Sequence, residues 1–104
     1  MYNPLQIKFQ ELYAQMQTVI TIEQELGSRG LQSIEEILSE LGVKMHNVSL
    51  TKEKRMYKIS NCKLAEEKEI YKSSGLKFIL MRRRDNLYMR VEFVNLLQYE
   101  SYDG

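Results

Sequence analysis

The residues of this chain best suited to bind a ligand are arginines in a predicted hairpin near the C-terminus. Arg82, Arg83 and Arg84 follow one another at the end of one predicted strand, and Tyr88 and Arg90 lie on the next. Because side chains alternate between the faces of a strand, Arg83, Tyr88 and Arg90 share the outer face, with Tyr88 opposite Arg83. Arginine beside an aromatic ring can pair with phosphates while a base stacks on the ring. The pattern predicts a nucleic-acid-binding surface formed by Lys77, Arg83, Arg84, Tyr88 and Arg90.

The same outer face also has the composition of a protein interface. Interface centres are enriched in aromatic residues, Met and Arg, whereas nucleic-acid-binding domains are as a rule strongly basic. The net charge is only +1, so a protein partner is the leading hypothesis and nucleic acid the alternative. A third interpretation needs no ligand, because charged hairpin tips and arginine–tyrosine contacts are common in sheets. The predicted partner-binding residues are Ile79, Met81, Arg83, Tyr88, Arg90 and Glu92.

Catalytic and metal-binding chemistry find little support in the sequence. His46 and Cys62 are the only His and Cys, and neither has a recognisable nucleophile, base or orienting partner nearby. Glu35 and Glu36 are adjacent on a predicted helix, where neighbouring positions do not share a face, and no His accompanies them. Residues 72–77 lack the glycine spacing of a phosphate-binding loop. We therefore expect a non-enzymatic protein without a catalytic site, metal or cofactor.

Two helices are predicted to precede the strands. The first spans residues 4–26, with a proline at its first position and Gly27 suited to the left-handed turn that ends a helix. The second spans residues 33–42, begins with a capping-box spacing and ends at Gly42. Residues 28–30 form the turn between them, which is short enough to make the helices packed neighbours.

The first predicted helix carries a continuous apolar stripe. Its residues recur at steps of three and four, which is typical of a coiled-coil seam, so self-association as a homodimer is one interpretation. The stripe is wider than a strict seam, and this favours packing on the protein's own sheet. The stripe consists of Leu5, Phe9, Leu12, Met16, Val19 and Leu26, widened by Tyr13 and Ile20.

From residue 43 the hydrophobic period changes to that of strands. Residues 45–50 and 55–64 alternate and are predicted to form a hairpin whose loop is Lys52 and Glu53, with Val48 opposite Tyr57 and His46 opposite Ile59. For residues 64–72 the helix propensity favours a short helix, and a strand through Ile70 and Tyr71 is the alternative.

The final hairpin is the most clearly specified β element. Strands over 76–83 and 87–96 flank Asp85 and Asn86, residue types that tolerate positive φ and suit a tight turn. With that turn Leu80 lies opposite Val91 and Phe78 opposite Phe93, and Arg84 lies opposite Leu87. The alternation assigns one face to the core, namely Leu76, Phe78, Leu80, Met89, Val91 and Phe93.

These elements predict an α+β fold of two layers, in which two N-terminal helices pack on an antiparallel sheet of about four strands. A length of 104 residues suits a single domain, helical over 1–42 and mainly sheet over 43–97, with a polar tail over 98–104. The helical part carries two basic and six acidic side chains, whereas residues 43–95 carry thirteen basic and six acidic ones. A single cysteine, no long apolar run and no signal-like start predict a cytoplasmic protein that does not enter a membrane.

Overall fold

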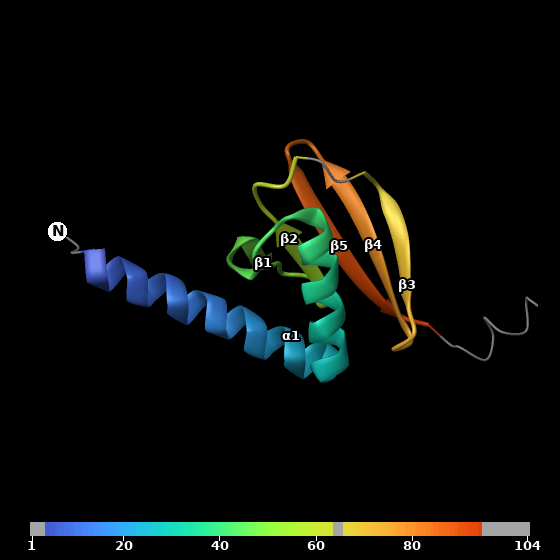
Figure 1. The fold of residues 1–104 in the computed structure, drawn as a ribbon, viewed down its shortest axis with the longest axis horizontal. Helices are drawn as coiled ribbons and strands as arrows, with labels where there is room; N and C mark the ends of the chain where they lie inside the picture. The colour runs from blue at the N-terminus through green and yellow to red at the C-terminus, as the bar shows by residue number, and fades with distance from the viewer. Residues whose placement is uncertain (1–3, 64–65, 95–104) are drawn as a thin grey trace, which may run out of the picture.

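The computed structural model describes residues 4–63 and 66–94 of the chain. It confirms an α+β fold, with one long N-terminal helix and an antiparallel sheet of five strands. The elements are the helix α1 (Pro4–Leu41), a short 3-10 turn η1 (Met45–Asn47), and strands β1 (Val48–Leu50), β2 (Met56–Ile59), β3 (Lys68–Lys72), β4 (Leu76–Arg83) and β5 (Asn86–Phe93). The strand order in the sheet is β1-β2-β5-β4-β3 (Figure 1). The predicted tail over 98–104, the end of the last predicted strand, Leu64 and residues 1–3 lie outside the described residues.

The prediction of two helices joined by a turn is wrong, because α1 is one element that bends sharply at Gly27. Gly27 has φ 77° and ψ 175°, a backbone region that essentially only glycine occupies. Residues 28–30 are helical again, so a single residue makes the bend and no loop is needed. Ser33 does not cap a new helix; its hydroxyl donates to the carbonyl of Arg29 inside α1 at 2.9 Å. The predicted end is confirmed, since Gly42 follows Leu41 with φ 70°.

The segment of α1 after the bend forms the core with the sheet. Ile34, Ile37 and Leu38 are at most 2% exposed and belong to one buried cluster with the inward side chains of β4 and β5. Gly30 is buried there, and a Cβ atom on it would lie 3.2 Å from Leu76 Cδ1 and would overlap Leu26 Cβ. A side chain at this position would therefore collide with Leu26 of α1 itself, whereas its contact with the end of the Leu76 side chain on β4 would only be tight.

The segment of α1 before the bend projects away from the sheet (Figure 1). We call residues 4–20 the arm. The expectation that the apolar stripe packs on the protein's own sheet is wrong for the arm, where the stripe residues are exposed apart from the half-buried Val19; Leu26, which lies beyond the arm, is buried in the core. The helix instead turns Thr18 and Ile22 toward the body, 7% and 0% exposed, and each helical residue is rotated by about 100° from the next. The stripe therefore points in a different direction from the buried face.

The last hairpin forms as predicted, but its register is shifted by two residues. The loop is Arg84 and Asp85, with Arg84 at φ 57°, so Leu80 lies opposite Met89 and Phe78 opposite Val91. A two-residue shift keeps every side chain on its face, unlike a shift of one. The predicted core residues are accordingly buried, with the exception of Phe93. Arg83 pairs with Asn86, and Leu87 lies opposite Arg82 rather than Arg84.

Phe93 is 58% exposed, which contradicts the prediction that it faces the core. It lies opposite Leu76 at the end of β5 and borders a groove with Thr21 and Glu25 instead of packing beneath α1. The Arg55 guanidinium lies over its ring at 5.1 Å. Alternation predicts the side of the sheet on which this ring lies. It does not predict whether a helix covers that end of the sheet, and α1 does not cover it.

The first hairpin also has a register two residues away from the predicted one. Val48 lies opposite Ile59 and Leu50 opposite Tyr57, because the loop is longer than two residues. Residues 45–47 form a 3-10 turn, so His46 has no strand partner.

Residues 68–72 form strand β3, so the prediction of a short helix there is wrong. Ile70 lies opposite Phe78 and is half-buried beside the core. Pairing with the open edge of β4 overrides the helix propensity of this segment.

Candidate functional site: the outer face of the sheet

The face of the sheet opposite α1 is not covered by any described element (Figure 1). The structure places all six predicted partner-binding residues there, with Ile79, Met81, Tyr88 and Arg90 half-buried and Arg83 and Glu92 exposed. The register differs from the expected one, because Tyr88 lies opposite Met81 rather than Arg83. This change brings the apolar side chains together, since Ile79 lies two residues before Met81 on the same face of β4. We call Ile79, Met81 and Tyr88 the outer patch.

Strands β2 and β3 widen this face in a way that the sequence did not indicate. Lys58 lies opposite Tyr88 and Met56 opposite Arg90, because β2 pairs with β5 across a long stretch of chain. On the other side Glu69 of β3 lies opposite Ile79. Met56 is 4% exposed although it belongs to the outer face, so it packs among its neighbours. The outer patch therefore lies at the centre of a wider surface with charged side chains at its border.

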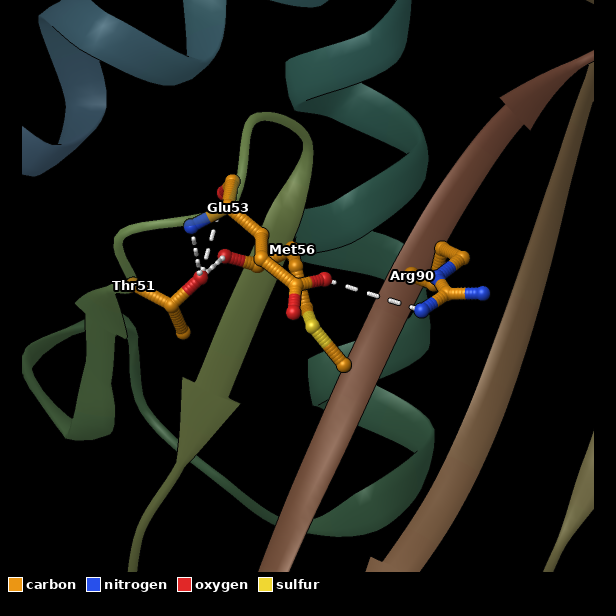
Figure 2. A network of polar contacts seen from close by, with 4 residues as sticks. All are labelled: Thr51, Glu53, Met56 and Arg90. Carbon is orange, nitrogen blue, oxygen red and sulfur yellow. Dashed lines mark hydrogen bonds and ion pairs between the residues drawn. The ribbon is translucent and has the colours of Figure 1, made fainter.

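Two of the bordering cations are already paired with acidic side chains. Arg90 Nη2 lies 3.6 Å from Glu53 Oε2, an ion pair visible in Figure 2. Lys77 Nζ lies 3.4 Å from Glu69 Oε1 and 5.5 Å from the ring centre of Tyr71. Both pairs are partly open to solvent, so each stabilises the fold little, but each neutralises charge beside the outer patch. Two of the five residues predicted to bind nucleic acid are thus locally balanced.

The three consecutive arginines have different surroundings. Arg82 is directed to the core side, as predicted, and its Nη2 donates to the carbonyl of Cys62 at 2.7 Å. Arg83 and Arg84 are exposed at the tip of the β4–β5 hairpin and form no ion pair with a described residue. Only these two of the three are therefore available to an anionic ligand.

The loop between β1 and β2 lies next to this hairpin tip. Thr51 Oγ1 accepts from the backbone N–H of Glu53 at 3.1 Å and donates to the carbonyl of Met56 at 2.8 Å, which fixes the loop (Figure 2). Between the loop and the tip is a shallow groove of about 450 Å³. Its lining residues are Thr51, Lys52, Glu53, Met56, Arg83, Arg84, Asn86 and Tyr88.

A polar cluster on the core side, which sequence reasoning missed, joins α1 to the sheet. Glu25 Oε2 accepts from Tyr57 Oη at 2.6 Å and from the backbone N–H of Arg55 at 3.1 Å. The pKa of Tyr57 is raised far above its ordinary value, because the phenol is buried and because the Glu25 carboxylate accepts its hydrogen bond. Nothing in the local pattern of either residue indicates this contact, since 32 positions separate them.

The residues considered for catalysis or metal binding are not drawn into this face. Cys62 is 6% exposed within the core cluster, and His46 is exposed at η1 beside α1. Over residues 4–63 and 66–94, no three His, Cys, Asp or Glu side chains gather as a metal site would require. No helix in the same ranges is both long and apolar enough to cross a membrane.

Comparisons of the chain with models of known protein families, with curated proteins and with solved structures give no match.

Proposed function

We propose that this chain is a small non-enzymatic interaction protein, such as an inhibitor, adaptor or accessory subunit, and that it binds a protein partner. The binding surface is the outer face of the last hairpin, formed by Ile79, Met81, Arg83, Tyr88, Arg90 and Glu92. The observation that carries the proposal is the outer patch, in which an aromatic ring, a methionine and an isoleucine are contiguous on an uncovered sheet face.

The charges around the outer patch support a protein rather than a polyanion as the ligand. Arg90 and Lys77 have acidic partners within the fold, and Glu92 adds a further negative charge opposite Lys77. A border of mixed charge around an apolar centre is the usual anatomy of a protein interface. Phosphate binding instead requires several cations that are free to replace counterions.

The test is capture of a partner by variants of the outer patch. Met81→Asp places a charge at the centre of the proposed interface and is expected to weaken partner binding by at least roughly 30-fold, the loss typical of an interface hot spot. Leu50→Asp is the matched control, because it makes the same kind of change at a side chain that is 41% exposed on β1, outside the outer patch. Circular dichroism establishes that both variants keep the fold. Equal capture by the wild type and Met81→Asp would reject this surface.

Nucleic-acid binding is the second candidate, and the groove beside the hairpin tip favours it. Lys52, Arg83 and Arg84 line that groove together with Tyr88, so cations and a ring for base stacking lie in one place. Titration with single- and double-stranded oligonucleotides at low salt tests it. Binding through phosphates would weaken linearly with salt on a log–log scale, and Arg83→Ala would reduce the slope by about 1. Absence of binding at low salt would reject this candidate.

A further inference from the structure

The arm of α1 exposes more large apolar side chains than any other part of the described chain. Six of them share the stripe and are between 44% and 69% exposed, namely Leu5, Phe9, Leu12, Tyr13, Met16 and Ile20. Val19, at the end of the stripe, is half-buried. Exposed apolar surface of this extent and continuity is uncommon on soluble monomers and marks an interaction site.

The direction of the stripe shows that the body of the protein does not cover it. With about 100° of rotation per residue, the stripe occupies an arc of roughly 120° on the helix. Thr18 and Ile22, which contact the body, lie on another side, and Ile7 is on the face opposite the stripe. The arm also has little tertiary support, although helices in proteins gain most of their stability from packing of an apolar face. A partner that packs against the stripe would stabilise this helix.

We infer that the stripe binds the stripe of a second copy of this chain, so that two arms form a short antiparallel coiled coil. Leu5, Phe9, Leu12, Met16 and Val19 are separated by alternating steps of four and three residues, the spacing of seam positions that pack knobs into holes. Such a seam is self-complementary, as the interface of a two-fold dimer must be.

The charge of the arm argues for a second copy rather than a lipid surface. Lys8 and Glu11 are its only charged residues, and the polar side is otherwise mostly glutamine and threonine. Helices that lie on membranes carry many Lys and Arg on the polar side, and this one does not. Two arms also bring no like charges together along the seam, so nothing in their electrostatics opposes pairing.

The area available is enough for a specific dimer. If each of the six exposed side chains loses on the order of 100 Å² on pairing, two arms bury roughly 1,200 Å² in total, the lower limit of standard interfaces. Because the stripe shares no residue with the outer patch, which lies on β4 and β5, the dimer leaves the outer patch of each copy free. The inference is therefore independent of the proposed function.

The antiparallel direction follows from Glu23, which occupies the next seam position after Val19. In a parallel pair Glu23 would lie against Glu23 of the second copy, and like charges at a seam are unfavourable. In an antiparallel pair centred between residues 10 and 11, Leu5 lies opposite Met16 of the second copy and Phe9 opposite its Leu12. The Glu23 carboxylates of both copies then lie outside the paired region.

Analytical ultracentrifugation of the full chain tests the dimer. The wild type is expected to sediment as a monomer–dimer equilibrium in the micromolar range, and Phe9→Glu is expected to raise the dissociation constant by at least roughly 30-fold. Ile7→Glu is the matched control, because Ile7 is 45% exposed on the opposite face of the same helix, and it should change the constant by less than about threefold. A wild type that stays monomeric up to about 1 mM would overturn the inference, as would equal effects of the two variants. Co-sedimentation of a monomeric wild type with phosphatidylcholine–phosphatidylglycerol vesicles would overturn it in favour of a lipid surface.

Cysteine crosslinking tests the direction of the pair in a Cys62→Ser background. Disulfides do not form when the two Cα atoms are more than about 7 Å apart. An equimolar mixture of Leu5→Cys and Met16→Cys chains is therefore expected to give the mixed crosslinked dimer, whereas Leu5→Cys alone should give none. Crosslinking of Leu5→Cys alone would overturn the antiparallel arrangement.

Discussion

Glu25, two positions before the bend in α1, links the helix to the sheet through a single carboxylate oxygen. Its Oε2 accepts from the Tyr57 hydroxyl and from the backbone N–H of Arg55. Tyr57 is 1% exposed, so its hydroxyl has no access to water as an alternative acceptor. A buried donor that loses its acceptor costs about 1–3 kcal/mol, which makes Glu25 more important for stability than its place on a polar helix face suggests.

The raised pKa of Tyr57 predicts a loss of stability at high pH. The pKa is higher in the folded protein than the ordinary 10.0, so the folded state keeps the proton more tightly than the unfolded chain. This contribution is present in full below about pH 10 and is lost as the pH rises above it. Tyr57→Phe removes it. Urea unfolding between pH 8 and 11 should show a steeper decline in the free energy of unfolding for the wild type than for Tyr57→Phe.

The control for this experiment is Tyr71→Phe, because Tyr71 is an exposed tyrosine whose removal leaves the buried phenol in place. Its pH profile should follow that of the wild type. If the Tyr57→Phe profile also coincides with that of the wild type, the hydrogen bond to Glu25 does not keep the Tyr57 phenol protonated in the folded protein at high pH.

At the scale of elements, the bend at Gly27 decides what α1 can do. Residues 4–20 of the helix are the exposed arm, whereas Ile22 and Leu26, just before the bend, and the segment after it belong to the core. In a straight helix the arm and the segment after Gly27 would lie on one axis, so they could not both keep their present positions. Gly30 reflects how sharp the bend is, because a Cβ atom on it would overlap Leu26 Cβ, which lies on the other side of Gly27.

Gly27→Ala is expected to lower the free energy of unfolding by about 1–3 kcal/mol, because φ 77° with ψ 175° is strained for any residue with a Cβ atom. Steric overlap does not contribute, since a Cβ atom at this position would have no described neighbour within 4 Å. Urea denaturation measures the change, and Ser28→Ala, at the exposed next position, should stay within about 0.5 kcal/mol. Equal stabilities for the two variants would mean that the backbone conformation at Gly27 is not strained for a residue with a Cβ atom.

At the scale of the whole molecule, the fold separates two surfaces that have different uses. The arm extends from one side of the body, while the outer patch lies on the sheet face that α1 does not cover (Figure 1). If the arms pair as inferred, the dimer presents two outer patches. A partner with two binding sites would then gain avidity without any new contact.

Pairing of the arms predicts that thermal stability depends on protein concentration. Association of folded chains shifts the unfolding equilibrium by mass action, so the midpoint Tm of the wild type should rise between about 1 and 100 μM. Differential scanning calorimetry measures it, and the midpoint of Phe9→Glu should be independent of concentration over the same range. A constant midpoint for the wild type would contradict pairing.

The sequence by itself indicated the α+β class, the two faces of the last hairpin and an interruption of regular helix at Gly27, although it predicted two helices there and not one bent helix. Alternation placed Phe78, Leu80 and Val91 in the core, and an even register shift left them there. Glycine at position 27 marked the end of regular helix, because only glycine takes that conformation without strain. These features depend on local periodicity and backbone chemistry, which a single sequence expresses directly.

Only the tertiary structure decided which surfaces are covered. Residues 68–72 became a strand because the edge of β4 offered hydrogen bonds, and β2 joined β5 across some thirty positions of chain. The stripe of the arm remained exposed because the contacts at Ile22 rotate it away from the sheet. Each outcome depends on which distant segment of the chain packs beside these residues. The energy of such contacts does not appear in any local window of sequence.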